Sequence, residues 1–477
     1  MEIMQLLRRL YAPDYMLKPH QRLEEHYNTS EFYKTFIKVA WPAVAESFLL
    51  GLVSFVDNIM VSTVGTDAVA AVGLTNQPRL TFYAVFLAIS IAVTAIVSRR
   101  KGEGRQEDAN KCLAQTLSLV LMLGIILVGV AIVFAEPIIR FSGANEDTLE
   151  MATGYFRIVM VGMLFTSISL TVNAAQRGSG NTRISMTTNV TANIVNCIFN
   201  ALLINGLFFF PKLGVTGAAI ATLLGNMVAC GMSLASLLPK DRFLRLKPSA
   251  LFKFRRDDLS LILKISSSAA VEQVFMRIGF FTTAKLVAEL GTIDFSAHTL
   301  VMSVSIMSFC FGDGLGVAAS ALVGQNLGRK RPDCSIIYGK VAQRIGIMGA
   351  AVLAGILIFL AEPISMLFMT GENDPDKIHA ILKLSVVMLK ILSAITLGQI
   401  SQVIFTGCIR GAGDTKFSAI VGLVCIAVVR PILTFTFCYI LSLGAIGAWL
   451  AILCDQYLRL VFMAWRFSSG KWAKVKV

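Results

Sequence analysis

Residues 112–134 read CLAQTLSLVLMLGIILVGVAIVF, a run without a single charged side chain. A helix of about 20 apolar residues crosses the hydrocarbon core of a bilayer. Barrel strands would be shorter, about ten residues with strict alternation. Similar long runs recur along the 477 residues, so the sequence predicts an all-α integral membrane protein with twelve spans. They are expected near 38–64, 79–98, 112–134, 151–173, 184–206, 215–237, 265–288, 298–323, 341–360, 380–406, 417–440 and 446–465.

The charge pattern indicates how these spans are oriented. The chain is 55% hydrophobic and 15% charged, with a formal charge of +14, whereas soluble domains carry about 25% charged residues. Basic residues gather in alternate connections, with five in 99–111, eight in 238–264 and five in 328–344, but one each in 135–150, 206–214 and 361–377. This alternation follows the positive-inside rule. We therefore expect both termini and the 238–264 connection in the cytoplasm, and no nucleic-acid partner.

The first 34 residues and the cysteines suggest no further processing. Residues 1–34 are polar and of mixed charge, which does not fit a cleaved signal peptide. The nine cysteines lack metal-ligand spacing, and neither a disulfide framework nor a cofactor is expected. Residues 1–34 are therefore expected to be a cytoplasmic N-terminal segment.

An internal duplication organises the chain. At an offset of 226 residues, Glu46 matches Glu272, and Ala-Glu-Pro-Ile at 135–138 recurs at 361–364. After insertions, Arg-Gly-Ser-Gly-Asn-Thr at 177–182 still matches Arg-Gly-Ala-Gly-Asp-Thr at 410–415. Two pseudo-symmetric six-helix bundles are predicted, at 35–237 and 265–466, joined by the basic linker 238–264 and followed by a basic tail, 467–477. Such parallel repeats are typical of transporters whose substrate cavity alternates its access.

The energy source is expected to be an ion gradient. The chain contains no G-x-x-x-x-G-K-[ST] phosphate loop. This excludes an ATP-driven pump contained in this chain, though not one completed by a partner subunit.

Asp57 in the first span is the main candidate for ion coupling, because a charged side chain inside a membrane is costly and is usually functional. Glu46 lies eleven residues earlier, so both carboxylates are expected on one helix face. The alternative for Asp57 is a partly solvated residue near the outer end of its span.

The fifth span carries a stripe of asparagines on one helix face. Their amides can hydrogen-bond a carboxylate or offer oxygen ligands to Na⁺; the alternative is a structural contact between helices. In the second half Asp57 corresponds to Thr283, and the stripe is absent, so ion coupling is expected in the first half. The stripe consists of Asn189, Asn193, Asn196 and Asn200.

The second half offers different polar residues. Glu272 is expected to titrate or to receive a cationic substrate, or else to be a structural partner of a basic group. Arg277, on the same span, is expected to reach a carboxylate on another helix. Gln399 and Gln402 are candidate cavity residues. The two Arg-Gly-x-Gly-x-Thr motifs are expected to be cytoplasmic turns whose arginines anchor at the membrane surface. Asp455 and Arg459, four residues apart, are expected to pair along one helix.

Several motifs together resemble the multidrug and toxic compound extrusion (MATE) family. They are Trp41-Pro42, Val56-Asp57-Asn58-Ile59-Met60, Gly217-Ala218-Ala219-Ile220-Ala221-Thr222, Arg277-Ile278-Gly279, Val323-Gly324-Gln325-Asn326-Leu327-Gly328 and the two arginine-glycine motifs. The resemblance covers nearly the whole chain after about residue 35, and around Glu272 and Arg277 the sequence looks closer to DinF-like bacterial members. It implies a V-shaped pair of bundles that exports organic cations in exchange for Na⁺ or H⁺.

The resemblance also assigns site residues. Asp57 matches the family's coupling aspartate, with Asn196, Asn200 and Thr222 as its polar partners and as a possible Na⁺ site. Glu272 matches a second-half carboxylate of the NorM-type branch, but Gln399 stands where that branch has a second acid. Glu46, Asn189, Asn193, Arg277 and Gln402 are expected to line the cavity or contact substrate.

The sequence therefore predicts an efflux antiporter in the bacterial cytoplasmic membrane, monomeric, with a small organic and cationic substrate. The alternative is a flippase for a lipid-linked saccharide or another amphiphile. An intramembrane enzyme is not expected, since the four histidines form no H-x-x-x-H pair. The flippase is favoured by basic residues in the second half, which are Arg277, Lys285, Lys383, Lys390 and Arg430.

Overall fold

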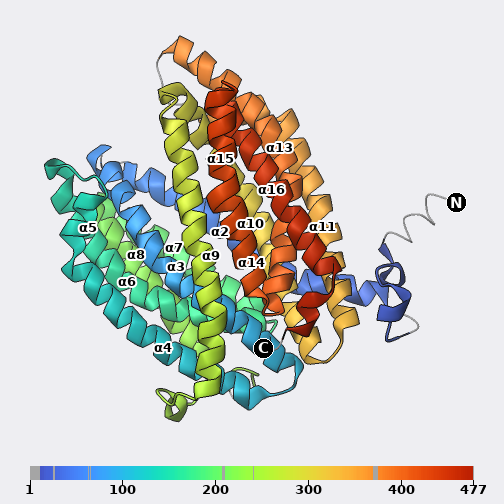
Figure 1. The fold of residues 1–477 in the computed structure, drawn as a ribbon. Coiled ribbons are helices and arrows are strands. Elements are labelled where there is room, and N and C mark those ends of the chain that lie inside the picture. Colours follow the sequence, from blue (N-terminus) through green and yellow to red (C-terminus); the bar gives the residue numbers. More distant parts are fainter. Residues whose placement is uncertain are drawn as a thin grey trace. The chain divides into compact units, whose positions relative to one another are not determined.

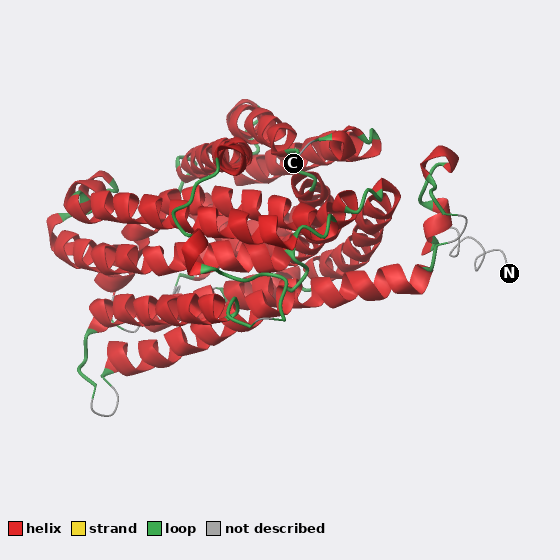
Figure 2. Cartoon of the chain, turned by 90° about the horizontal axis from the view of Figure 1, so that it is seen from below, coloured by secondary structure: helices red, strands yellow, loops and turns green. Residues whose placement is uncertain are grey.

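A computed structural model describes residues 11–24, 27–62, 64, 66–206, 210–239, 241–368 and 374–475. For residues 14, 20, 54–59, 61, 62, 66, 67, 69 and 248 only the backbone belongs to this description. Throughout the described ranges the chain forms helices joined by loops and turns (Figure 2). Twelve of these helices are long and apolar enough to cross a membrane. The predicted helical membrane fold with twelve spans is confirmed.

The order of the helices follows the predicted duplication (Figure 1). The first six spans are α2 (Thr29–Ser62), α3 (Thr66–Gly102), α4 (Gln106–Val133), α6 (Glu146–Gly178), α7 (Thr182–Asn205) and α8 (Gly214–Ala235). The next four are α9 (Arg256–Ala288), α10 (Thr292–Gly328), α11 (Pro332–Phe359) and α13 (Pro375–Gly411). The last two are Thr415–Ile440 and α16 (Gly444–Ser468).

The eleventh span and two short helices differ from long, regular α-helices. The eleventh span combines α14 (Thr415–Gly422) and α15 (Arg430–Phe435) with π-helical segments at Leu423–Val429 and Thr436–Ile440. Short helices α5 (Ala135–Phe141) and α12 (Ala361–Leu367) both begin with the repeated Ala-Glu-Pro-Ile motif. The same sequence thus adopts the same short helix in each half.

Exposed apolar side chains and close helix packing suit a lipid environment. On α4, Ile125 and Ile126 are each 58% exposed, which would be unfavourable in water but matches acyl chains. Where helices touch, glycine allows close approach: a Cβ added at Gly217 of α8 would lie 2.5 Å from the carbonyl oxygen of Leu203 on α7. Small residues at such contacts are typical of membrane helices.

The chain divides into two compact units, residues 45–270 and residues 1–44 with 271–477. Helices α2 and α9 therefore each contribute residues to both units. The predicted bundle limits of 35–237 and 265–466 stay a prediction.

The unit of residues 45–270 has an apolar core formed by α3, α4, α5 and α6. Its large fully buried side chains are Phe86, Leu113, Ile139, Phe156 and Met160. Of these helices, α6 also carries Arg177, which belongs to the polar site described below.

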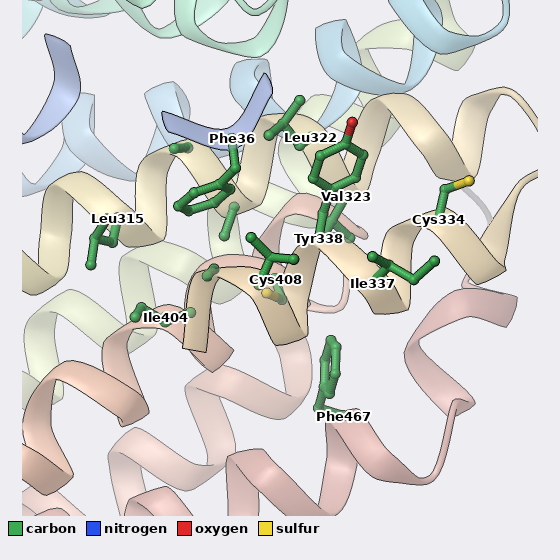
Figure 3. Packing of buried hydrophobic residues seen from close by; sticks show 14 of the residues in the cluster. Phe36, Leu315, Leu322, Val323, Cys334, Ile337, Tyr338, Ile404, Cys408 and Phe467 are labelled. Atoms are coloured by element: carbon green, nitrogen blue, oxygen red, sulfur yellow. The ribbon is translucent and has the colours of Figure 1, made fainter. Parts of the chain in front are cut away.

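The other unit has a core that includes the start of α2 (Figure 3). Phe36 of α2 is fully buried in a cluster with Leu322 of α10, Tyr338 of α11, Cys408 of α13 and Phe467 of α16. A further cluster in this unit surrounds buried Trp449.

The segment before α2 folds back onto α11 in the same unit. The Tyr27 hydroxyl donates to Asp333 Oδ2 at 2.8 Å. Arg331 bridges Glu24 at 2.6 Å and Asp333 at 2.7 Å. Lys340 donates to the carbonyl oxygen of Met16, whose side chain is 1% exposed. Polar contacts and the burial of Met16 therefore hold the segment before α2 against α11.

Candidate functional site

A buried carboxylate, Glu46 of α2, is the centre of a polar site in the unit of residues 45–270. Its Oε1 accepts hydrogen bonds from Arg177 Nη1 at 3.2 Å, Ser185 Oγ at 2.9 Å and Asn189 Nδ2 at 2.5 Å. Glu46 is 5% exposed. Three donors on one oxygen, one of them cationic, hold this carboxylate in a fixed orientation.

The turn between α6 and α7 positions these donors. Arg177 is in the last turn of α6, and the chain reverses at Gly180, whose φ of +85° is a left-handed conformation that favours glycine. Helix α7 then begins at Thr182, so Ser185 and Asn189 lie one turn apart on the same face. The turn formed by the Arg-Gly-x-Gly-x-Thr motif thus places Arg177, Ser185 and Asn189 within hydrogen-bond distance of Glu46.

The two carboxylate oxygens of Glu46 differ in their hydrogen bonding. Oε2 is buried and has no hydrogen-bond partner among the described residues. An unsatisfied buried carboxylate oxygen is costly. It is therefore the point at which a proton or a small cation would find an acceptor.

The unit of residues 1–44 and 271–477 contains the corresponding site around Glu272 of α9. Glu272 Oε1 accepts from Arg410 Nη2 at 2.7 Å and from Ser418 Oγ at 2.8 Å. Glu272 is 5% exposed, and its Oε2 is again buried without a partner in the described part of the chain. The two halves of the duplication thus contain carboxylate sites in which the glutamate accepts from an arginine and a serine.

The second motif builds this site as the first motif does. Arg410 is in the last turn of α13, and Gly413 has a φ of +87°. Helix α14 begins at Thr415 and places Ser418 in its first turn. Gly422 occupies the place that Asn189 has in the first site, and a Cβ added there would lie 3.3 Å from Glu272 Cγ. The second site therefore has two donors and a glycine where the first has three donors.

The motif arginines form ion pairs that the sequence did not predict, and their anchoring at the membrane surface stays a prediction. The side chains of Arg177 and Arg410 are only 15% and 24% exposed, and each forms an ion pair with a buried glutamate. Charged side chains within membrane-spanning helices commonly pair with one another. The signal was available in the sequence, because glutamate, arginine and serine recur together in both halves.

The asparagine stripe of α7 divides between two sites. Asn189 binds Glu46, whereas Asn200 Nδ2 donates to Asn196 Oδ1 at 3.2 Å and Asn196 Nδ2 donates to Thr222 Oγ1 of α8 at 3.3 Å. Asn196 and Asn200 are 6% and 2% exposed. The structure brings together the three polar residues that the resemblance assigned to one site.

The structure describes the side chain of Asn193 but not that of Asp57. The Asp57 side chain lies outside the residues whose side chains the structure describes. Asn193 is half-buried, and its Nδ2 has no hydrogen-bond partner within the described ranges. No group of three or more histidine, cysteine or acidic residues that could hold a metal occurs among the described residues.

The remaining second-half candidates are spread over different contacts. Arg277 is half-buried, and the described residues include no carboxylate paired with it. Gln399 is buried, with Oε1 unpartnered in the described part of the molecule. Gln402 Nε2 donates within α13 to Thr406 Oγ1 at 2.9 Å. Thr283, the counterpart of Asp57, donates to the carbonyl oxygen of Gly279.

A third charged group was only partly predicted. The expected pair of Arg459 and Asp455 is present at 3.1 Å within α16. Arg430 of α15 also binds Asp455, with its Nε 3.0 Å from Oδ2. All three side chains are at most 9% exposed, so the cluster places a net positive charge inside this unit.

The family model described as MatE matches residues 42–202 and 268–436 of this chain. The two matched segments correspond to the two halves of the duplication. Together they include Glu46, Arg177, Glu272 and Arg410.

Among curated proteins, the "Probable multidrug resistance protein NorM" of Thermotoga maritima is 27% identical over 448 residues, 93% of this chain and 94% of that protein. The "Uncharacterized transporter YisQ" of Bacillus subtilis is 24% identical over 92% of this chain and 95% of its own length. The "FAD transporter" of Shewanella oneidensis is 28% identical over 68% of this chain and 71% of its own length.

Solved structures show the same fold. A "MOP superfamily transporter from Pyrococcus furiosus" superimposes with a TM-score of 0.85 at 21% identity, covering 92% of this chain and 97% of that one. An "outward-facing conformation of a multidrug resistance MATE family transporter" gives the same TM-score, identity and coverage.

Proposed function

The chain belongs to the MatE family of membrane transporters, and on that premise we propose that it is a secondary active exporter of small organic compounds. It exchanges them for H⁺ or Na⁺ across a bacterial cytoplasmic membrane, with both termini in the cytoplasm, and acts as a monomer. Its substrate is organic and cationic. The names of its relatives, several of them multidrug resistance proteins, support export of drug-like compounds.

One observation carries the proposal: two carboxylates lie inside membrane-spanning helices, each with a buried oxygen that the described residues leave unpartnered. A charge in the middle of a bilayer costs roughly 2.5–3.5 kcal/mol on insertion scales. A structural ion pair alone would satisfy both carboxylate oxygens more completely. The free oxygens of Glu46 and Glu272 instead suit a group that gains and loses a cation during a cycle.

Each unit has its own proposed coupling residues, and Glu46 is a further candidate in the unit of residues 45–270. We assign ion coupling to Asp57, Asn196, Asn200 and Glu272, with Thr222 as an oxygen donor next to the two asparagines. Proton or Na⁺ binding neutralises a carboxylate, and the resulting rearrangement lowers the affinity for a cationic substrate. Mutually exclusive binding of the two cations gives exchange, because such coupling is reciprocal.

The direct test is efflux of ethidium or norfloxacin in everted membrane vesicles with imposed Na⁺ or H⁺ gradients. Wild type is compared with Asp57→Asn, Glu272→Gln and Glu46→Gln. We expect each substitution to reduce gradient-driven transport at least tenfold. Lys253→Gln, which removes an exposed charge from the linker, serves as a control with normal transport.

The outcomes discriminate between the two halves. Normal transport by Asp57→Asn together with loss in Glu272→Gln moves the coupling site to the second half. Unimpaired transport by all three variants contradicts the antiport mechanism. Transport that needs neither gradient contradicts secondary active coupling altogether.

A second candidate function, transport of an anionic amphiphile such as a lipid-linked saccharide, is favoured by the buried cluster of Arg430, Asp455 and Arg459. Its net positive charge would attract phosphate rather than an organic cation. The same vesicles distinguish the two candidates. Competition of ethidium efflux by other cations supports drug export, and competition by an anionic nucleotide such as FAD, but not by cations, supports the alternative.

A further inference from the structure

A groove on the unit of residues 45–270 has a volume of about 640 Å³, within the range of roughly 300–1,000 Å³ that is usual for ligand pockets. One wall is the first half of α9, and the other comes from α3 and α4. None of the glutamate or asparagine sites above contributes to it. The apolar residues opposite α9 include Val85, Ile89, Leu119 and Leu123.

The α9 wall is a single helix face. Its lining residues recur at intervals of three and four positions from Arg256 to Ala270, which is the spacing of one face of an α-helix. The face carries Leu259 and Leu263 beside Ser260 and Lys264. From Arg256 to Ala270 it extends about 21 Å at 1.5 Å per residue. That length corresponds to one leaflet, since half of the hydrocarbon core is about 15 Å and the headgroup region adds several more.

The two basic residues of the groove lack acidic partners. Arg256 and Lys264 are both exposed, and neither forms an ion pair within the described ranges. Lysine and arginine extend their charged groups toward the membrane surface, and helical side chains lean toward the start of their helix. The Lys264 ammonium is therefore directed toward the end of the groove at which Arg256 lies.

That end of the groove is built by polar contacts. Gln115 of α4, 2% exposed, donates to Asp258 Oδ2 at 3.2 Å and accepts from the backbone N–H of Arg255 at 3.1 Å. Ser118 Oγ accepts from the N–H of Phe252 at 2.9 Å. These bonds fasten the start of α9 to α4, and Asp258 is already engaged. The Arg256 end of the groove is thus held by hydrogen bonds to α4.

We propose that the groove binds one anionic phospholipid of the leaflet that faces the basic linker. The acyl chain lies against the leucines and isoleucine, and the phosphate lies between Arg256 and Lys264. Each basic residue near an anionic lipid surface contributes about 1 kcal/mol, roughly fivefold in affinity. The proposed site is separate from substrate and ion binding and does not depend on the direction of transport.

The test is lipid binding to the purified full-length chain in detergent, measured by native mass spectrometry during titration with phosphatidylglycerol and with phosphatidylcholine. We expect one saturable phosphatidylglycerol site and much weaker phosphatidylcholine binding. The double variant Arg256→Gln/Lys264→Gln should weaken phosphatidylglycerol binding about 25-fold. Lys253→Gln removes a nearby charge that does not line the groove, and it should bind as wild type does.

A second variant tests the apolar wall. Ala270→Phe fills the end of the groove away from Arg256 and should reduce the occupancy of phosphatidylglycerol while both cations remain. Inorganic phosphate at equal ionic strength should not compete, since the acyl chain contributes to binding. Equal affinity for the two lipids, or unchanged binding in Ala270→Phe, would overturn the proposal. Asp57→Asn and Glu272→Gln should keep full lipid binding, so failure of the antiport mechanism is distinguished from failure of this site.

Discussion

The two buried glutamates are held by the same pair of side chains and differ in their third neighbour. Glu46 receives Arg177, Ser185 and Asn189 on one oxygen. Glu272 receives only Arg410 and Ser418, and Gly422 lies where the amide would be. The duplication therefore reproduced the arginine and serine that position a carboxylate, while one helical turn further on the two copies diverged.

The comparison shows which hydrogen-bond donors the two sites share and which one they do not. The ion pair and the hydroxyl orient the carboxylate in both units, since they come from the same motif. The additional amide gives Glu46 one more hydrogen-bond donor than Glu272 has among the described residues. The two sites therefore share the arginine and the serine but hold their carboxylates with different numbers of donors.

Removing the arginines is expected to have the largest effect. Arg177→Met and Arg410→Met each leave a buried carboxylate without its cation, which costs about 3–5 kcal/mol. Arg410→Met should lower the thermal unfolding midpoint in detergent more than Arg177→Met, because Glu272 keeps one donor and Glu46 keeps two.

Matched variants check this interpretation. Adding Glu272→Gln to Arg410→Met should restore most of the lost stability. Arg140→Met, at an exposed ion pair with Glu136 and Glu146, should leave the midpoint unchanged. If neither arginine variant shifts the midpoint, the ion pairs do not stabilise the fold.

Substitutions of the glycines that follow the two arginines are expected to cause the next largest loss of stability. A Cβ at Gly411 would lie 2.2 Å from the carbonyl oxygen of Ser320, and a Cβ at Gly178 would lie 2.8 Å from that of Thr94. Overpacking costs about 1–3 kcal/mol, so Gly411→Ala should unfold at a lower temperature than Gly178→Ala. Gly355→Ala, which meets nothing within 4 Å, should be neutral or slightly stabilising. The reverse order of the first two would contradict the packing described for these helices.

The third neighbour itself gives a smaller effect. Asn189→Ala removes a hydrogen bond to a charged group, which is worth about 1.5–3 kcal/mol, with the low end expected because Asn189 is only half-buried. Gly422→Ala adds a tight contact 3.3 Å from Glu272 Cγ and should change stability by less than about 1 kcal/mol. Unfolding midpoints of both variants measure the difference. A larger loss in Gly422→Ala would show that the second site has no room for the missing amide.

The two serines are expected to contribute at the low end of the same range. Ser185→Ala and Ser418→Ala each remove one hydroxyl donor to a carboxylate, worth about 1.5 kcal/mol. Ser418→Ala should be the more costly of the two, since Ser418 is one of only two donors to Glu272. Unfolding of the single variants beside Ser185→Ala/Asn189→Ala would reveal whether the donors to Glu46 act independently. Identical midpoints for the two single variants would contradict the asymmetry.

The fold could be predicted from sequence because its determinants are local. Each span is a long apolar run. Within lipid, a helix forms all of its backbone hydrogen bonds inside one segment, whereas strands must close into a barrel. The offset between Glu46 and Glu272 also revealed the duplication without any knowledge of contacts.

The site was predictable only in part. Glu46, Asn189 and Glu272 were recognised as polar residues in apolar runs, but their partners were not. Arg177 is 131 residues away from Glu46, and no local pattern records which helix faces meet. The arginine motifs were therefore interpreted from their turns alone, and the ion pairs were missed. The π-helical segments of the eleventh span likewise depend on packing against neighbours.

The contacts of the N-terminal segment have a consequence for synthesis. Tyr27 finds its partner Asp333 only after 306 further residues have been made, about 15–60 s later at 5–20 residues per second. Until then Met16 and Phe36 lack the cover that α10 and α11 provide. Residues 45–270 are contiguous and can complete their unit during that interval. The segment before α2 is thus made early and completes its contacts late.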